Sequence, residues 1–433
     1  MTTASAPPDT ASAEGSGRLL AGWRSRHGAD LDAHTRMYGQ ILIPAGDPNW
    51  STAFANEIEA SGLTGRGGGG FSSWRKLDAV RSASRAPTLI VNAMEGEPAS
   101  SKDRVLLACS PHLVLDGAQI TAAAIGAARI MVCVAQNDPD SAESVFRAID
   151  ERQRRIPDRI PFEVARPPGR FITGEESALA SWLDGRTAAP TFRTDKAIPL
   201  RVKRRPVLIH NAETLAHAAL ISRRGWRWFR QCGTSESPGT TLVTVSGAVD
   251  NPGVYEVALG TELDKIVVGA GLKDWPGAVI VGGYGGSVVG PDQLAVGFCN
   301  EELCAVGAST GAGVVAVIPR SVCGVAETAR AARYLARQSS GQCGPCMFGL
   351  PAIASSLESL WRGEGGAKSL QLIESRLGQV TGRGACRHPD GAARFVSTAM
   401  RVFSADFASH AVGRPCRFAN RQSVLHFGRE GHR

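Results

Sequence analysis

The sequence predicts three successive regions: an α/β region, a small β-rich region and a C-terminal helical region that carries a cysteine site. Between residues 88 and 215, apolar runs of strand length alternate with segments of helical spacing, which is typical of an α/β layer. From residue 241 the chain changes to β-branched residues and turn sequences, and from residue 325 Ala, Arg, Leu and Glu recur at helical spacing. The length of 433 residues also favours several domains over one core.

The domain limits are placed where the composition changes. Residues 1–50 form an N-terminal extension that is partly disordered, since its first part, to about residue 17, is polar, small and proline-bearing. The predicted regions are 51–238 for the α/β domain, 239–322 for the β-rich domain, 323–412 for the helical domain and 413–433 for a basic tail, expected to be loose.

Within the α/β region, apolar spacing predicts each element in turn. A helix over residues 51–62 leads into a glycine-rich loop, and a second helix carrying Arg75 and Lys76 follows the loop. The further strands are expected over 88–92, 128–135 and 160–165 and from 207, with helices over 111–126 and 140–154. This alternation is what a layered α/β fold requires.

The glycine-rich loop covers residues 65–71, Gly-Arg-Gly-Gly-Gly-Gly-Phe, and matches Gly-x-Gly-x-x-Gly. A Rossmann fingerprint requires a preceding strand, whereas here a helical segment precedes the loop. We therefore expect a loop whose backbone amides approach a phosphate, without a Rossmann fold. A flexible linker is the alternative, and the closeness of Arg66, Phe71 and Lys76 weakens it.

Acidic residues follow two of the predicted turns. Glu95 and Glu97 come directly after the strand over 88–92, where α/β folds place ligands. Glu175 and Glu176 stand at the start of a helix, where carboxylates complement the helix N-terminus, so capping is enough to explain one of them. Helix capping or surface exposure is an equally good explanation for Glu95 and Glu97.

Three cysteines predict a metal site in the helical region. Cys343 and Cys346 form a Cys-x2-Cys pair on a glycine- and proline-bearing turn, and Cys386 follows about forty residues later. Buried, inert thiols are the alternative. Because zinc and cubane clusters usually take four ligands, one position is open, and Ser340, His388 or a solvent molecule are the candidates for it.

Charge and cysteine usage exclude several classes of protein. The net charge of +8 comes from local basic runs without a nucleic-acid recognition motif, so we expect no nucleic-acid partner and instead solvated faces or a docking surface for an acidic partner such as a ferredoxin. The ten cysteines form no repeating framework and no signal peptide is evident, which predicts reduced thiols in a cytoplasm. The longest apolar run is too short to span a bilayer, so membrane association would go through a partner.

The order of these motifs resembles the NADH-binding flavoprotein subunit of respiratory complex I, a family shared with NAD-reducing hydrogenases and NAD-dependent formate dehydrogenases. The resemblance covers roughly residues 55–410, and several motifs in matching order are more specific than one. The matching stretches are 65–71 with Lys76, 92–104, 174–179, 211–215, the β-rich stretch 246–256 and the cysteine region.

The resemblance implies an FMN- and NADH-binding α/β domain, a ubiquitin-like β domain and a helical bundle with a 4Fe-4S cluster. It also implies partners, namely a ferredoxin-like or other iron-sulfur protein, or a membrane redox subunit. By resemblance, the FMN-binding residues are Gly65, Arg66, Gly67, Gly68, Gly70, Lys76, Asn92, Glu95, Gly174, Glu175, Asn211 and Thr214. Phe71, Glu97 and Glu176 are expected to face the nicotinamide nucleotide, with Glu97 and Glu176 as catalytic residues, and Cys343, Cys346, Cys386 and Ser340 are the expected metal ligands.

The sequence departs from the family pattern at five places. Ser340 stands where the family has the first cluster cysteine, which predicts either a serine-ligated 4Fe-4S cluster or a labile or 3Fe-4S cluster. The other departures are Met94 for an acid, Phe171 for a tyrosine, residues 193–197 for Lys-Pro-Pro-Phe-Pro, and His210 for an asparagine. Each change removes a hydrogen bond or a stacking face from the cofactor site.

The leading hypothesis is a flavin and iron-sulfur oxidoreductase that passes electrons from NADH through FMN to the cluster and a partner. One alternative is a ferredoxin-linked flavoprotein that does not use NAD, which the altered residues on the NADH side favour. The other is a degenerate scaffold subunit without turnover. Flavin that responds to ferredoxin but not NADH would select the first alternative, and absence of flavin would select the second.

Overall fold

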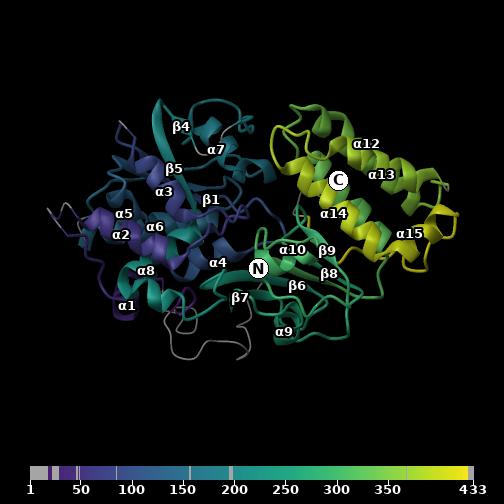
Figure 1. Ribbon diagram of the computed structural model, residues 1–433, viewed down its shortest axis with the longest axis horizontal. Helices are drawn as coiled ribbons and strands as arrows, with labels where there is room; N and C mark the ends of the chain where they lie inside the picture. The colour runs from purple at the N-terminus through teal and green to yellow at the C-terminus, as the bar shows by residue number, and fades with distance from the viewer. Residues whose placement is uncertain are drawn as a thin grey trace.

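The computed structural model describes residues 18–21, 29–44, 47, 49–83, 85–155, 158–194, 198–366 and 368–427. The α/β part and the helical part lie side by side along the longest axis, and the β-rich part lies below and between them (Figure 1). Two mixed sheets and a C-terminal helical part confirm the predicted fold class at this level. The disorder expected for residues 1–17 falls outside the described residues, as do positions 195–197 of the altered NADH-side stretch.

The first sheet has the strand order β3-β2-β1-β5-β4. Its strands are β1 (Thr88–Ala93), β2 (Arg129–Val134), β3 (Phe162–Ala165), β4 (Arg201–Val202) and β5 (Arg205–Asn211). The first three strands and β5 run parallel, and β4 is an antiparallel edge. The chain leaves β1 toward β2 and β3 and returns to its other side as β5. The strand order therefore reverses between β1 and β5, which is where open α/β sheets bind ligands.

Helices bury both faces of the first sheet. They are α2 (Trp50–Ser61), α3 (Ser73–Arg81), α4 (Lys102–Cys109), α5 (Pro111–Ala124), α6 (Pro139–Arg155), α7 (Glu176–Leu183) and α8 (Ala212–Phe229). Leu89 and Val91 of β1 belong to the core under α5 and α8, whereas Ile90 faces the smaller core that Leu179 of α7 completes. A strand buried on both faces reads as a continuous apolar run, which is why β1 was predictable. The expected helices and strands of this region are confirmed within a few residues.

The second sheet has the order β7-β6-β10-β8-β9. Its elements are β6 (Thr240–Gly247), β7 (Gly253–Ala258), α9 (Leu263–Gly269), β8 (Ala278–Val281), β9 (Ser287–Val289), α10 (Asn300–Ala305) and β10 (Val314–Ile318). The first strand, β6, pairs in parallel with the last strand, β10, and all other pairs are antiparallel. The core on one side contains Leu263 and Val267 of α9. The predicted β-rich region is therefore confirmed.

The helical part packs on the second sheet. It consists of α11 (Gly324–Arg337), α12 (Leu350–Trp361), α13 (Lys368–Val380), α14 (His388–Val402) and α15 (Ser404–Ala411). Thr398 of α14 accepts a hydrogen bond from the backbone N–H of Val288 in β9, at 2.9 Å. One hydrophobic core runs from β8 and β10 into α11, α12 and α14, so the helices extend the sheet's core.

The N-terminal extension contains an ordered helix, α1 (Leu31–Tyr38), which the sequence reasoning did not predict. Its His34 lies 2.7 Å from the buried carboxylate of Asp116 on α5. Arg152 of α6, at 2.7 Å, and Arg223 of α8 pair with the same carboxylate, and together these groups hold the pKa of Asp116 well below its usual range. One buried carboxylate thus joins four helices and fixes the extension.

The start of the basic tail is packed, which corrects the expectation that it is loose. Leu425 and Phe427 are buried, and the indole of Trp361 donates a hydrogen bond to the carbonyl of Ala419 at 2.7 Å. The ring of Phe427 lies 5.0 Å from that of Tyr284 and 5.6 Å from that of Tyr334. Residues 413–427 therefore follow the helical part as a strap that ends on these two tyrosines.

Within the described ranges, no single helix is long and apolar enough to cross a membrane. The neighbours α4 and α5 pass that test only as a pair, and a bend of 95° separates them.

Replacing Phe427 with Ala is expected to lower the free energy of unfolding by about 3 kcal/mol, because a buried aromatic ring is lost from the contact with Tyr284 and Tyr334. Urea denaturation measures this change. Val412→Ala, directly before the strap, is the matched control, since Val412 is 64% exposed and its truncation should leave stability almost unchanged. Equal effects of the two substitutions would contradict a packed tail.

Candidate functional site

The glycine-rich loop lies at the point where the first sheet reverses its strand order. The backbone N–H of Arg66 donates to Oγ1 of Thr214, at the start of α8, at 2.9 Å. A Cβ on Gly67 would lie 3.3 Å from Cβ of Asn211, the last residue of β5, so a side chain here would press on Asn211. Three residues of the predicted cofactor site, Gly67, Asn211 and Thr214, are thereby brought together.

The loop is closed on itself and open toward solvent. Gly65 donates its N–H to the carbonyl of Phe71 at 2.9 Å, which closes the turn. Gly68 and Gly70 have φ values of 97° and 56°, which favour glycine. No atom lies within 4 Å of a Cβ built on Gly69, so the loop leaves room above it. Phe71, 43% exposed, stands at the loop's end as the predicted stacking face.

Lys76 on α3 and Glu176 on α7 form an ion pair across the edge of the sheet. Both side chains are partly exposed, so neither is locked into the interior. The predicted phosphate-side cation and the predicted nicotinamide-side acid thus neutralise each other in this structure. Beneath them lies His210, whose burial and the nearby charge of Lys76 lower its pKa to about 3, so it is neutral.

The guanidinium of Arg66 is bound by groups of the protein itself, and its expected place on the phosphate side stays a prediction. It is buried and donates to Oγ1 of Thr64 at 2.7 Å and to the carbonyl of Thr240 at 3.3 Å. Arg66 therefore fastens the loop to the first strand of the second sheet. What remains for a ligand is the backbone of the loop.

A buried network of charges that the sequence reasoning missed supports the loop. The ammonium of Lys102, on α4, lies 2.7 Å from Asp103, 3.0 Å from Glu213 and 3.1 Å from Oδ1 of Asn211. Glu213 is fully buried and also accepts hydrogen bonds from the hydroxyl of Thr241 and the N–H of Leu242, both at 2.9 Å. The charge of Lys102 is the chief cause that lowers the pKa of Glu213 to about 2, against the opposing effect of burial. Lys102 and Glu213 lie within stretches that the resemblance covers, but nothing in their spacing marks them as partners.

Asn92 and Gly174, which are both predicted to lie around the flavin, are in direct contact. Nδ2 of Asn92, in β1, donates to the carbonyl of Gly174 at 2.9 Å. A Cβ on Gly96 would lie 2.7 Å from the carbonyl oxygen of Phe171, so the turn after β1 and the segment 171–174 pack backbone against backbone. Met94, one of the family departures, is buried beneath them.

The carboxylates of Glu95 and Glu175 are used as helix caps. Glu95 adopts a φ of 35° and accepts hydrogen bonds from the N–H groups of Asp103 and Arg104, both at 3.0 Å, at the start of α4. Glu175 accepts from the N–H of Ala178 at 2.9 Å at the start of α7. Capping, which the sequence left open for both, accounts for these side-chain positions.

Glu97 is buried between the turn after β1 and the turn after β8. Its carboxylate accepts hydrogen bonds from the N–H of Ala99 at 3.2 Å and from the N–H of Tyr284 at 2.9 Å. A Cβ on Gly283 would lie only 2.4 Å from this carboxylate. Burial raises the pKa of Glu97 to about 7, although the backbone hydrogen bonds oppose the shift. Glu97 is thus a carboxyl group that changes its charge near neutral pH, at the junction of the two sheets.

Cys343, Cys346 and Cys386 gather on one side of the helical part. The N–H of Cys346 donates to the carbonyl of Cys343 at 3.0 Å, which sets both thiols on one turn. Burial, together with the nearby thiols of Cys343 and Cys386, raises the pKa of Cys346 to about 12. Two sulfurs on a glycine-bearing turn, with a third from the segment before α14 close to them, fit an iron-sulfur cluster. Ser340, the fourth predicted ligand, is half-buried three residues before Cys343.

His388, a predicted candidate for the open ligand position, is fixed by a backbone carbonyl and an aromatic ring. Its Nε2 donates to the carbonyl of Leu335 at 2.8 Å, and its ring packs on that of Phe171 at 5.4 Å.

The turn that carries Cys343 and Cys346 is hydrogen-bonded to the α/β part. Arg170 donates to the carbonyl of Ser339 at 3.0 Å, and Gln342 donates to the carbonyl of Pro190 at 2.6 Å.

Two family models match the chain. Residues 58–219 match the Nuo51 FMN-binding domain, and residues 326–410 match the NADH-ubiquinone oxidoreductase-F iron-sulfur binding region. One of the F subunits of NADH-quinone oxidoreductase from Rhizobium meliloti (strain 1021) is 33% identical over 375 residues, which cover 83% of this chain and 89% of that protein. The chain belongs to the family of NADH-quinone oxidoreductase F subunits. The F subunit of Escherichia coli (strain K12) is 30% identical over 373 residues, covering 81% of this chain and 83% of that one.

Solved structures agree with this assignment. An NAD+-reducing NiFe hydrogenase in the H2-reduced state matches with a TM-score of 0.76 and 30% identity over 86% of this chain. The air-oxidised state of such a hydrogenase matches with a TM-score of 0.78 and 27% identity over 95% of this chain. The matches span 64% and 69% of the hydrogenase chains, so those chains contain further segments.

The ionisation of Glu97 is expected to make stability fall as the pH rises. The folded state binds the proton more tightly than the unfolded state, whose pKa is 4.5, so the stabilisation is present below pH 4.5 and is lost as the pH passes 7. The loss amounts to about 3 kcal/mol. In Glu97→Gln this contribution is absent, so between pH 5 and pH 8 the variant gains stability relative to the wild type, as measured by urea denaturation. Glu163→Gln is the control, because Glu163 is the exposed residue of β3. The same gain in stability with pH in that variant would contradict the assignment to Glu97.

Proposed function

We propose that this F-subunit homologue oxidises NADH and delivers the electrons through FMN to an iron-sulfur cluster and onward to a partner subunit. The observation that carries the proposal is that two separate sites meet. The segment around Phe171 packs against the turn after β1 at the cofactor edge, and its backbone and ring also contact the helical part beside the cysteine turn. Electrons would then pass from one site to the other through this packed segment.

FMN would be held by the loop over residues 65–70 and by Lys76, with Asn92, Gly174, Asn211 and Thr214 at the strand ends. The fit rests on the amides of a glycine loop at a strand-order reversal and on the space above Gly69. Lys76 would exchange its partner, since a phosphate competes with Glu176 for the same ammonium. Arg66, Glu95 and Glu175 would act indirectly, by fixing the loop and the starts of α4 and α7.

NADH would lie along Phe71, Glu97 and Glu176. Phe71 offers an exposed ring for stacking, and Glu176, once released from Lys76, offers a carboxylate for hydroxyl or amide groups. Glu97 would accept or release a proton near neutral pH at the junction of the sheets. A bound flavin supplies the remaining chemistry, because it takes up two electrons and releases them singly.

The cluster would be held by Cys343, Cys346, Cys386 and Ser340. The resemblance puts three cysteines and Ser340 at the four ligand positions, so a hydroxyl would stand in for the fourth thiolate. An alkoxide binds iron less readily than a thiolate because its proton is harder to remove, so the site holds its fourth iron more weakly. A 4Fe-4S cluster that loses one iron readily is the expected consequence.

The partner would dock beside the cysteine turn. Met347 and Phe348 follow Cys346 directly and are 51% and 72% exposed. An apolar pair at the rim of a cluster suits an interface with another subunit. The named relatives are a quinone oxidoreductase subunit and an NAD+-reducing hydrogenase, which supports an iron-sulfur or membrane redox subunit as the acceptor. Cytoplasmic placement with membrane association through that subunit is part of the proposal.

The β-rich region over residues 239–322 would be a ubiquitin-like domain between the domains at 51–238 and 323–412. Its strand order places the second strand, first strand, last strand, third strand and fourth strand side by side, with the first and last parallel. A helix, α9, follows the first hairpin.

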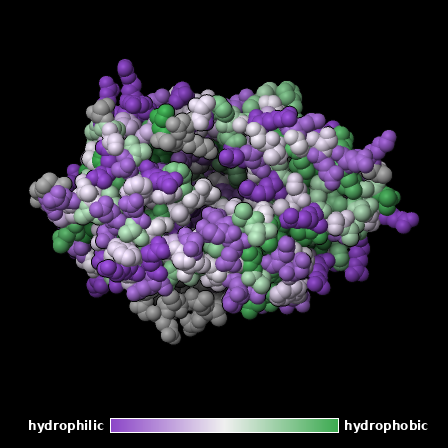
Figure 2. Space-filling view, viewed as in Figure 1, coloured by the Kyte–Doolittle hydropathy of each residue, from purple (hydrophilic) through white to green (hydrophobic). Residues whose placement is uncertain are grey.

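On one face, a hollow rimmed mostly by hydrophilic residues separates the part that carries α7 from the helical part (Figure 2).

The proposal is tested by purifying the full chain without oxygen and recording visible and EPR spectra, with flavin and iron quantified, before and after adding NADH. Bleaching of bound FMN together with a reduced-cluster signal is the expected result. Flavin that stays oxidised with NADH but responds to reduced ferredoxin would overturn the NADH route in favour of a ferredoxin-linked flavoprotein. Absence of both cofactors from protein produced with ample iron and riboflavin would leave the scaffold alternative.

Replacing Lys76 with Met is expected to remove most of the bound FMN, because the cation beside the glycine loop is lost while the loop's own contacts stay. Flavin released by heating, measured per chain, gives the result. Arg75→Met is the matched control, since Arg75 is the exposed neighbour on the same helix. Full flavin content in Lys76→Met would rule out Lys76 as a phosphate ligand.

Replacing Ser340 with Cys is expected to raise the iron content toward four per chain and to slow cluster loss in air, since a fourth thiolate becomes available. Iron and sulfide analysis before and after air exposure measures this effect. Ser222→Cys, at an exposed position on α8, is the control for simply adding a thiol. If both variants behave alike, Ser340 does not occupy a ligand position.

A further inference from the structure

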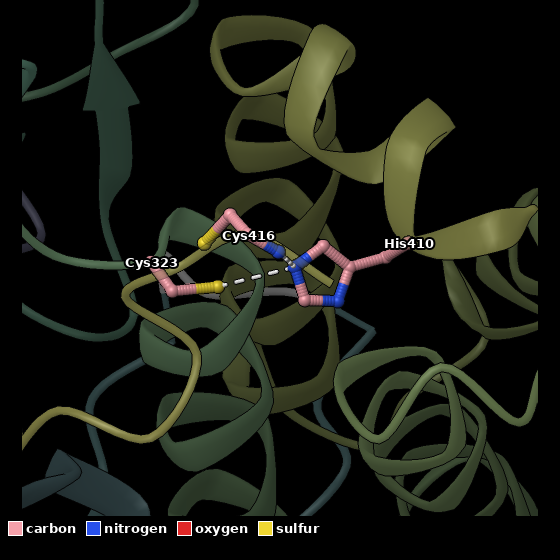
Figure 3. A group of neighbouring side chains, drawn as sticks. All are labelled: Cys323, His410 and Cys416. Atoms are coloured by element: carbon pink, nitrogen blue, oxygen red, sulfur yellow. Dashed lines mark hydrogen bonds between the residues drawn. The ribbon is translucent and has the colours of Figure 1, made fainter. Parts of the chain in front are cut away.

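A second group of thiols and an imidazole lies in the helical part, away from the predicted cluster. Cys323 directly precedes α11, His410 lies on α15 and Cys416 lies in the strap of residues 413–427 (Figure 3). Their sulfur and nitrogen atoms all lie within 4.8 Å of one another. Cys323 is 1% exposed and His410 is completely buried, while Cys416 is half-buried.

The hydrogen bonds of His410 determine which nitrogen carries the proton. Nδ1 lies 3.1 Å from the carbonyl oxygen of Leu360, which only accepts, so Nδ1 is the donor. Nε2 accepts from the backbone N–H of Cys416 at 3.2 Å, and a metal ion would have to replace this hydrogen bond. A carbonyl that holds the far nitrogen is the usual support of a metal-binding histidine. Nε2, which lies 3.5 Å from Sγ of Cys323, is thus the nitrogen of His410 that a metal would use.

One distance in the group equals the sulfur–nitrogen separation of a tetrahedral zinc site. Zn–S and Zn–N bonds of about 2.3 Å and 2.05 Å at a tetrahedral angle separate the sulfur and the nitrogen by about 3.5 Å. The distance from Sγ of Cys323 to Nε2 of His410 is 3.5 Å. We propose that Cys323, His410 and Cys416 bind a zinc ion that clamps the C-terminal strap to the first and last helices of the helical part.

Charge and donor type favour zinc over other ions. Two thiolates neutralise a divalent cation, so the group is uncharged and suited to burial. Sulfur and imidazole donors exclude calcium and magnesium, which require oxygen ligands. Because Cys416 is half-buried, the fourth position opens toward solvent, and a water molecule fills it.

This group is separate from the predicted iron-sulfur ligands. Cys323 stands before the first residue of α11, and the turn with Ser340 and Cys343 follows its last residue. A helix of 14 residues is about 21 Å long. Neither Cys323 nor Cys416 therefore supplies the missing fourth ligand of the cluster.

The zinc ion would act through the tail. The strap beyond Cys416 is held by the bond from Trp361 to Ala419 and ends with Phe427 against Tyr284. Tyr284 in turn donates its backbone N–H to Glu97. A clamp at Cys416 fixes the start of this strap, so loss of the metal loosens the packing that reaches the cofactor side.

The test is metal analysis of the full-length protein. The wild type, Cys416→Ser, His410→Gln and Cys304→Ser are each incubated with a small excess of zinc chloride and desalted, and zinc and iron are then counted by elemental mass spectrometry. We expect about one zinc per chain more in the wild type than in Cys416→Ser or His410→Gln, with equal iron in all. Cys304→Ser is the matched control, because Cys304 is an exposed cysteine on α10 and should leave zinc unchanged.

A second measurement keeps the proposal testable if a variant folds poorly. Addition of a zinc chelator is expected to lower the melting temperature of the wild type but not that of Cys416→Ser. Zinc that is retained in Cys416→Ser and lost in Cys343→Ser would place the ion at the other cysteine turn and overturn the proposal. So would an intact-mass measurement showing that Cys323 and Cys416 form a disulfide, or a wild type that retains no zinc.

Discussion

The buried carboxylate of Glu213 holds the cofactor edge together. It begins α8 at the end of β5, pairs with Lys102 of α4, and accepts hydrogen bonds from Thr241 and Leu242 of the second sheet. Helices α4 and α8 of the α/β part and strand β6 of the second sheet thus all contact the carboxylate of Glu213. Since an unpaired charge is costly in the interior, none of these segments can move alone without leaving Glu213 or Lys102 exposed to that cost. The glycine loop is connected to this network by the hydrogen bond from the N–H of Arg66 to Thr214, the neighbour of Glu213.

The second constraint is the contact between the cofactor edge and the helical part. The backbone of Phe171 packs against Gly96 on one side, and its ring meets His388 and Tyr334 on the other. Hydrogen bonds from Arg170 and Gln342 fix the cysteine turn to the same surface. Where the resemblance implies a tyrosine, Phe171 keeps the ring, and the ring alone is enough for this packing. That departure therefore changes polarity without removing the contact.

The sequence was sufficient for the elements of the α/β part, the loop and the family, because periodic apolar spacing and local glycine patterns carry that information. It was not sufficient for α1, for the packed start of the tail or for the partners of Arg66 and Glu97. Arg66 reaches a carbonyl 174 positions away and Glu97 a backbone N–H 187 positions away, and such partners leave no trace in local spacing. Cys323 and His410 were missed for the same reason, since 87 residues separate them. Long-range polar contacts fix how a site works, and they appear only once the chain is folded.

The strap that ends on Tyr284 and Tyr334 also bears on how the protein is made. A ribosome releases Tyr284 and Tyr334 long before Phe427, and domains generally fold as they emerge. Both sheets and most helices are therefore complete while the ring cluster at their junction still lacks its last member. Newly made chains consequently pass through a stage in which the junction of the two sheets is still accessible.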